Sequence, residues 1–121
     1  MNKYRNTPQD IHLRIHKFVV SCFKNVVRKI PKTPENIPVI SQIASSLTSM
    51  GANDQEADAA VTRKDFIAKS CIVKKETKET NFWLRFILDS EILSRNNVEP
   101  YIWESQEILL IMSKIILNTR I

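Results

Sequence analysis

The stretch "SLTSMGANDQEADAA" (residues 46–60) contains Gly51, the only glycine in a chain of 121 residues. The stretch otherwise has the spacing of a helix, where a glycine costs about 1 kcal/mol relative to alanine. A single glycine leaves little material for β-turns, so hairpins are disfavoured. Ile, Leu, Lys, Glu and Ala recur at helical spacing along the rest of the chain, and this pattern predicts an all-α fold.

Capping residues and prolines divide the chain into four predicted helices within one domain, residues 1–121. Thr7, Pro8 and Asp10 have the spacing of a capped start for the first helix. The segment "PKTPENIP" (residues 31–38) then separates the first helix from the second.

Three further signals mark the remaining helices. Asn36 can cap the second helix, "TRKD" (residues 62–65) is a capping box for the third, and Pro100 is expected at the start of the fourth. Four helices of about 20 residues with short links predict an antiparallel up-down four-helix bundle.

Positive charge is concentrated near the beginning of the chain. Residues 1–32 contain eight Lys and Arg but one acid, a net charge of +7, whereas the remainder has a net charge of −2. On a helical wheel several bases form one ridge opposite the apolar face, and two more follow it. The predicted contacts with nucleic-acid phosphates are Arg14, Lys17, Lys24, Arg28, Lys29 and Lys32. The alternative is an ordinary solvated helix face, and no aromatic residue interleaves with the ridge.

The first and fourth helices have more apolar surface than a single bundle needs. The excess side chains are Val20, Phe23, Val27, Trp103, Leu110 and Leu117. We expect them to form an interface between copies of the chain, because self-association is the simplest way to cover them. The alternative is a thick core covered by neighbouring loops.

Glu76 and Glu79 lie on a partly apolar flank of the third helix, so both carboxylates need partners. The predicted structural network contains Asn53, Glu56, Arg63, Lys75, Glu76 and Glu79. A catalytic acid/base pair is the competing interpretation, but no nucleophile or histidine is placed beside the two glutamates.

Other functional classes find little support. Cys22 and Cys71 are far apart and are expected to be free thiols in a reducing cytoplasm. His12 and His16 have a metal-compatible spacing, but they lack the glutamates of a di-iron bundle. No nucleotide-binding glycine motif, secretion signal or membrane-spanning run is present, so no cofactor, metal or membrane partner is predicted and the expected location is cytoplasmic.

Several motifs resemble one bacterial family. They are "RIHKF" (14–18), the glycine stretch, "DFIAK" (65–69), "KKETKETNFWL" (74–84) and "ESQEILLI" (104–111). As a set they resemble the four-helix-bundle proteins encoded in intervening sequences of 23S ribosomal RNA genes. The similarity extends from about Leu13 to the C-terminus.

The resemblance implies a bundle that assembles into a closed homo-oligomeric ring, typically a pentamer. It also points to a related branch, the accessory variability proteins of diversity-generating retroelements, which bind nucleic acid and a reverse transcriptase. One residue departs from the pattern: many relatives have an arginine where this chain has Ser45.

These observations lead to a non-enzymatic, homo-oligomeric protein that binds RNA or DNA without reading its sequence. The alternative is a protein-interaction scaffold or an accessory subunit of a reverse transcriptase. Gly51 is expected to let a bulky neighbour approach closely, with the third helix around residues 76–83 as that neighbour.

Overall fold

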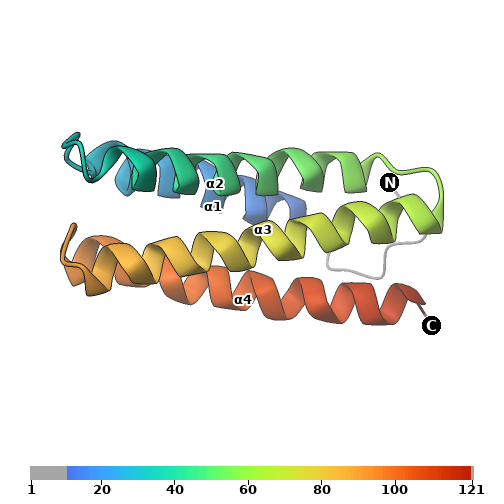
Figure 1. Ribbon diagram of the computed structural model, residues 1–121. Helices are drawn as coiled ribbons and strands as arrows, with labels where there is room; N and C mark the ends of the chain where they lie inside the picture. Colours follow the sequence, from blue (N-terminus) through green and yellow to red (C-terminus); the bar gives the residue numbers. More distant parts are fainter. Residues whose placement is uncertain (1–10, 121) are drawn as a thin grey trace.

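The computed structural model describes residues 11–120, and this part of the chain contains four α-helices and no strand. The helices are α1 (Ile11–Asn25), α2 (Ile37–Asp58), α3 (Arg63–Asp89) and α4 (Arg95–Arg120), and a short 3-10 turn, η1 (Val27–Lys29), follows α1. Figure 1 shows the four helices side by side. α3 packs against α2 and α4, whereas α1 contacts α2 and α4. The all-α prediction is confirmed. No helix among these residues is long and apolar enough to cross a membrane.

α2 and α3 begin at the positions that the sequence predicted. Pro38 lies in the first turn of α2, where its missing N–H removes no helical hydrogen bond. Asn36 precedes α2, but its side chain donates to the Pro31 carbonyl (3.0 Å) and fixes the connector instead of capping the helix. Thr62 caps α3 by accepting the Asp65 N–H at 3.1 Å. The predicted cap at Thr7, Pro8 and Asp10 lies outside the described residues.

The prediction for the start of α4 is wrong. Pro100 lies inside the helix, which already begins at Arg95. A proline near a helix start removes only one early hydrogen bond. The residues before it are supported by an ion pair between Arg95 and Glu99, one turn apart, and by the Asn97 N–H donating to the Ser94 carbonyl.

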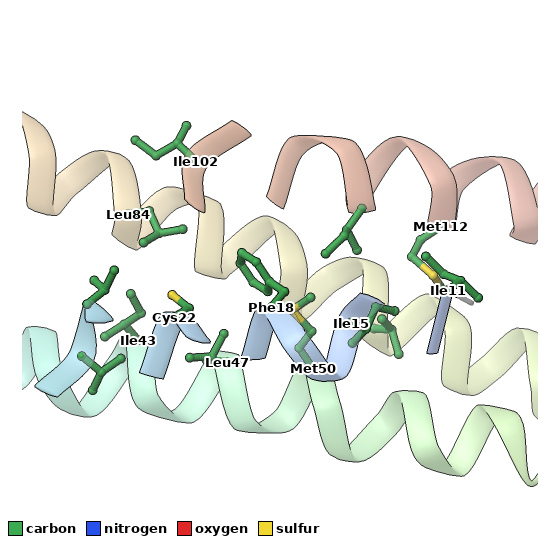
Figure 2. Packing of buried hydrophobic residues seen from close by; sticks show 14 of the residues in the cluster. Ile11, Ile15, Phe18, Cys22, Ile43, Leu47, Met50, Leu84, Ile102 and Met112 are labelled. Atoms are coloured by element: carbon green, nitrogen blue, oxygen red, sulfur yellow. The ribbon is translucent and has the colours of Figure 1, made fainter. Parts of the chain in front are cut away.

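The core runs along the length of the four helices. Figure 2 shows side chains of α1, α2, α3 and α4 meeting there, among them Ile15, Cys22, Leu47, Leu84 and Met112. Most of the core side chains are aliphatic and almost fully buried. Their removal from water is the main contribution to the stability of the fold.

Buried polar side chains link α3 to both of its neighbours. The hydroxyls of Ser46 (α2) and Thr80 (α3) are 2.9 Å apart, and the Asn81 amide donates to the Ser105 hydroxyl of α4 at 2.8 Å. Thr77 lies in α3 one turn before Thr80 and Asn81, and its buried hydroxyl donates to the Val73 carbonyl (2.7 Å). These hydrogen bonds offset the cost of burying polar groups.

The neighbour of Gly51 is α1, not α3 as the sequence suggested. A Cβ atom at this position would lie 3.4 Å from a methyl carbon of Val19. A methyl group there would be in ordinary van der Waals contact with Val19, so Gly51 lies where α2 packs closely on α1.

Candidate nucleic-acid interface

The predicted basic residues occupy α1, η1 and the connector that follows. Lys17 and Lys24 are exposed on α1, Arg28 and Lys29 are exposed in η1, and Lys32 is exposed beyond it. Because α1 ends at Asn25, the helical ridge is shorter than the wheel implied, and Arg28 belongs to the turn. Lys17, Lys24, Lys29 and Lys32 form no ion pair within residues 11–120. We refer to these four residues as the lysine track.

Arg14 is engaged within the protein. Its guanidinium donates two hydrogen bonds to the Glu104 carboxylate of α4, at 2.7 and 2.8 Å. This bidentate pair fixes the planar group in orientation and cancels its charge locally. Arg14 is therefore placed to join α1 to α4 and is less available to a phosphate than the lysines are.

Arg28 is held by an aromatic ring. Its guanidinium carbon lies 5.6 Å from the centre of the Phe23 ring, within cation–π range. The contact leaves the positive charge in place, since the ring carries no net charge. Phe23, predicted for an interface between copies, is partly buried and packs against the core of its own chain.

An aromatic side chain from α4 lies beside the basic ridge. The Tyr101 hydroxyl is 2.6 Å from the Ser21 hydroxyl and accepts a hydrogen bond from the Asn25 amide at 2.8 Å. Its ring is partly exposed and packs at a tilt against Phe18, with centroids 6.2 Å apart. Sequence reasoning missed this residue because the periodicity of α1 does not reveal which residues of α4 face it.

Two grooves meet along α1. The first lies between α1 and α4 and holds about 400 Å³; its lining comprises Leu13, Arg14, Lys17, Phe18, Ser21, Pro100, Tyr101 and Glu104. The second follows the exposed side of α1, and its lining comprises His16, Lys17, Val20, Ser21, Lys24 and Asn25. Lys17 and Ser21 line both grooves, so the two surfaces are continuous.

The predicted polar network does not come together in the single chain. Asn53 donates to the Ser49 carbonyl of its own helix at 2.9 Å. Glu56 instead pairs with Lys69 of α3 at 2.8 Å, and the hydrogen bond and charge of Glu56 raise the pKa of Lys69.

The other four members of that network are not joined to one another by a side-chain hydrogen bond or an ion pair within residues 11–120. Arg63 and Lys75 are exposed, whereas Glu76 and Glu79 are partly buried. In the described part of the chain neither glutamate accepts a side-chain hydrogen bond or forms an ion pair. Both are thus partly buried on α3 without the partners that the predicted network assigned to them.

The predicted apolar interface divides into exposed and buried members. Trp103, Leu110 and Leu117 of α4 are 62–67 % exposed, and Val20 of α1 is 42 % exposed. Val27 is only 5 % exposed and belongs to the core of the chain itself. We refer to the three exposed residues of α4 as the α4 stripe.

A second apolar surface on α3 was not predicted as an interface. Phe82, Trp83 and Phe86 form an aromatic cluster with ring centroids 4.9 to 6.2 Å apart. Phe82 and Phe86 are 46 % and 40 % exposed, and the Trp83 indole N–H is buried without a hydrogen-bond acceptor among the described residues. The fold thus exposes two different apolar surfaces.

Over residues 11–120 the fold and its surfaces define an all-helical protein with four α-helices, exposed lysines on α1 and the segment that follows it, and exposed apolar faces on α3 and α4. Residues 9–114 match the family described as 23S rRNA-intervening sequence protein, and the chain belongs to that family. A crystal structure of a protein with unknown function, from the S23 ribosomal protein family of Bacteroides thetaiotaomicron VPI-5482, is similar to it. The two chains are 32 % identical with a TM-score of 0.79, over 88 % of this chain and 95 % of the other. The comparison with curated proteins gives no match.

Proposed function

We propose that this protein is a non-enzymatic, homo-oligomeric nucleic-acid-binding protein that contacts the phosphate backbone of RNA or DNA through the lysine track. The observation that carries the proposal is the set of four exposed lysines without ion pairs in the described part of the chain. Counterion release from phosphates favours binding to such a surface without base recognition. The family's link with the 23S rRNA gene makes ribosomal RNA the first candidate ligand.

The assembly part of the proposal is an antiparallel up-down bundle whose copies close into a ring, with five copies as the family resemblance implies. Two unlike apolar surfaces, the α4 stripe and the α3 aromatic cluster, support a head-to-tail contact between copies. A head-to-tail contact generates a ring when its rotation closes. Each added copy would repeat the lysine track, so the field of the assembly exceeds that of one chain.

The non-enzymatic part of the proposal concerns Glu76 and Glu79. A general acid or base needs a reacting group within hydrogen-bond reach. Neither glutamate forms a side-chain hydrogen bond or an ion pair within the described residues, and no histidine, serine or threonine lines the surface groove that contains Glu79.

Fluorescence anisotropy with a labelled 30-nucleotide RNA and its DNA equivalent, titrated at several salt concentrations, tests the proposal. About four phosphate contacts per chain predict a log–log slope near −3 for single strands. The double variant Lys17→Gln/Lys24→Gln should weaken binding and reduce the slope by about 1.4, since two contacts are lost.

The matched control is Lys74→Gln/Lys78→Gln, which removes the same charge from exposed positions of α3. Equal effects of the two double variants would show that only net charge matters. Absence of binding at low salt would overturn the proposal. It would favour the second candidate, a protein-interaction scaffold or an accessory subunit of a reverse transcriptase, for which the exposed α3 aromatic cluster is the supporting feature.

A further inference from the structure

We infer that the groove between α1 and α4 binds a base of a single-stranded nucleic acid whose phosphates follow Lys17 and Lys24. This inference rests on the proposed function and specifies its ligand. The groove holds about 400 Å³, within the range of about 300–1,000 Å³ typical of small-ligand sites. It is continuous with the phosphate-binding side of α1 through Lys17 and Ser21.

The walls of the groove suit a flat, uncharged ring. Leu13, 54 % exposed, and the partly exposed ring of Tyr101 supply apolar surface. Base–aromatic stacking is the usual source of affinity for unpaired bases. The Glu104 carboxylate fixes the orientation of the Arg14 guanidinium at the edge of the groove.

The charges of the site place the base in the groove and the phosphates at the lysines. Inside the groove the Glu104 carboxylate cancels the charge of Arg14, so the interior does not attract a phosphate. Lys17 and Lys24 lie outside that pair, on the exposed side of α1. The two lysines are seven positions apart in the helix, which is about 10.5 Å along its axis. A strand lying along them would have its phosphates at the lysines and a base at the groove.

The polar groups at one end of the groove are already oriented. Ser21 and Asn25 hold the Tyr101 hydroxyl through contacts of 2.6 and 2.8 Å, which fixes the position of the ring. The free Glu104 lone pairs can accept from an exocyclic amino group, as carboxylates do from cytosine N4. A duplex cannot use this groove, because its bases are paired and stacked inside the helix.

The test compares a labelled 20-nucleotide strand with the corresponding 20-base-pair duplex, each as RNA and as DNA. We expect tighter binding of the single strand, and the RNA and DNA arms show which sugar is preferred. Tyr101→Leu keeps apolar volume but removes the ring and hydroxyl. It should weaken single-strand binding about 5- to 150-fold, the range expected for loss of one stacked base, and leave duplex binding unchanged.

A second variant keeps the test valid if Tyr101→Leu does not fold. Leu13→Ser changes a side chain that is already 54 % exposed, and should weaken single-strand binding without affecting duplex binding. Val61→Ser, which changes an 83 % exposed side chain outside the groove, is the matched control and should have no effect.

The outcomes separate the two proposals. Salt-dependent binding with equal affinity for strand and duplex, unaffected by Tyr101→Leu and Leu13→Ser, overturns the base site but retains the lysine track. No binding of either ligand overturns both. A 2-aminopurine base in the strand should lose fluorescence on binding to the unaltered protein but not to Tyr101→Leu, as expected for stacking on the ring.

Discussion

The Nδ1 atom of His12 lies 2.9 Å from both carboxylate oxygens of Asp54, a side chain that is only 2 % exposed. The other ring nitrogen, Nε2, is 3.4 Å from an oxygen of Asp58, one turn further along α2. His12 thus fastens the first turn of α1 to the last turns of α2. Asp54 would be costly to bury without such a partner.

His12→Leu should therefore destabilise the protein by about 3 kcal/mol, because it leaves the Asp54 carboxylate buried without its histidine. The double variant His12→Leu/Asp54→Leu should recover most of this loss, since it removes the charge together with its partner. Urea unfolding at one fixed protein concentration measures both. A double variant no more stable than the single one would contradict this account of Asp54.

Substitution of Gly51 by alanine should be tolerated. A methyl group there would lie at about contact distance from Val19, and alanine improves helix propensity by up to about 1 kcal/mol. Gly51→Leu should lower the midpoint of thermal unfolding, because its outer atoms would displace Val19 and loosen α1. Ala52→Gly, at the exposed neighbouring position, is the control and should cost about 1 kcal/mol. A stable Gly51→Leu variant would show that the close approach of α1 is not needed.

The α4 stripe should govern self-association. Leu110→Lys/Leu117→Lys places two charges in the proposed contact between copies and should reduce the mass in solution to that of one chain, with helix content retained. Light scattering coupled to size exclusion, with circular dichroism, measures both. The control Ile37→Lys/Val61→Lys adds the same charge at other exposed apolar positions. If the unaltered protein is itself a single chain at high concentration, the ring proposal fails.

Because of Cys22, the free energy of unfolding should fall as the pH rises through the alkaline range. Burial raises the pKa of its thiol from 9.0 to about 12. Above pH 9 the unfolded chain therefore releases this proton while the folded chain retains it, so the free energy of unfolding falls between about pH 9 and pH 12. Cys22→Ala should remove this part of the slope. At pH 8 iodoacetamide should modify the partly exposed Cys71 but not Cys22; rapid labelling of Cys22 in the folded protein would contradict the assignment.

Single-helix features were predictable from the sequence. The helical spacing of apolar residues predicts the number of helices. The Thr62 cap and the exposed α4 stripe follow from the order of residues within a single helix. The start of α4 was not predictable from Pro100 alone, because the Arg95–Glu99 pair and the preceding turn extend the helix upstream. A proline marks where a helix can begin, not where it must.

Relations between helices were harder to predict. A wheel places Gly51 and Glu56 on faces of α2 but does not tell which helix each face meets. Gly51 therefore contacts Val19 of α1, and Glu56 pairs with Lys69 instead of joining Glu76 and Glu79. For the same reason the sequence did not reveal the role of Tyr101, which reaches the basic surface only because α4 packs beside α1.

The hydroxyl contact of Ser46 with Thr80, and the amide contact of Asn81 with Ser105, also determine the longitudinal register of the helices. Aliphatic side chains alone permit one helix to slide along another by a full turn, about 5.4 Å, with similar contacts after the slip. Such a slip would separate the Asn81 amide from the Ser105 hydroxyl and the Ser46 hydroxyl from that of Thr80, although each hydroxyl also donates to a carbonyl of its own helix. The two polar contacts therefore favour one alignment of α2 and α4 on α3 over the slipped ones, and they fix the positions along the helices at which the α4 stripe and the α3 aromatic cluster lie.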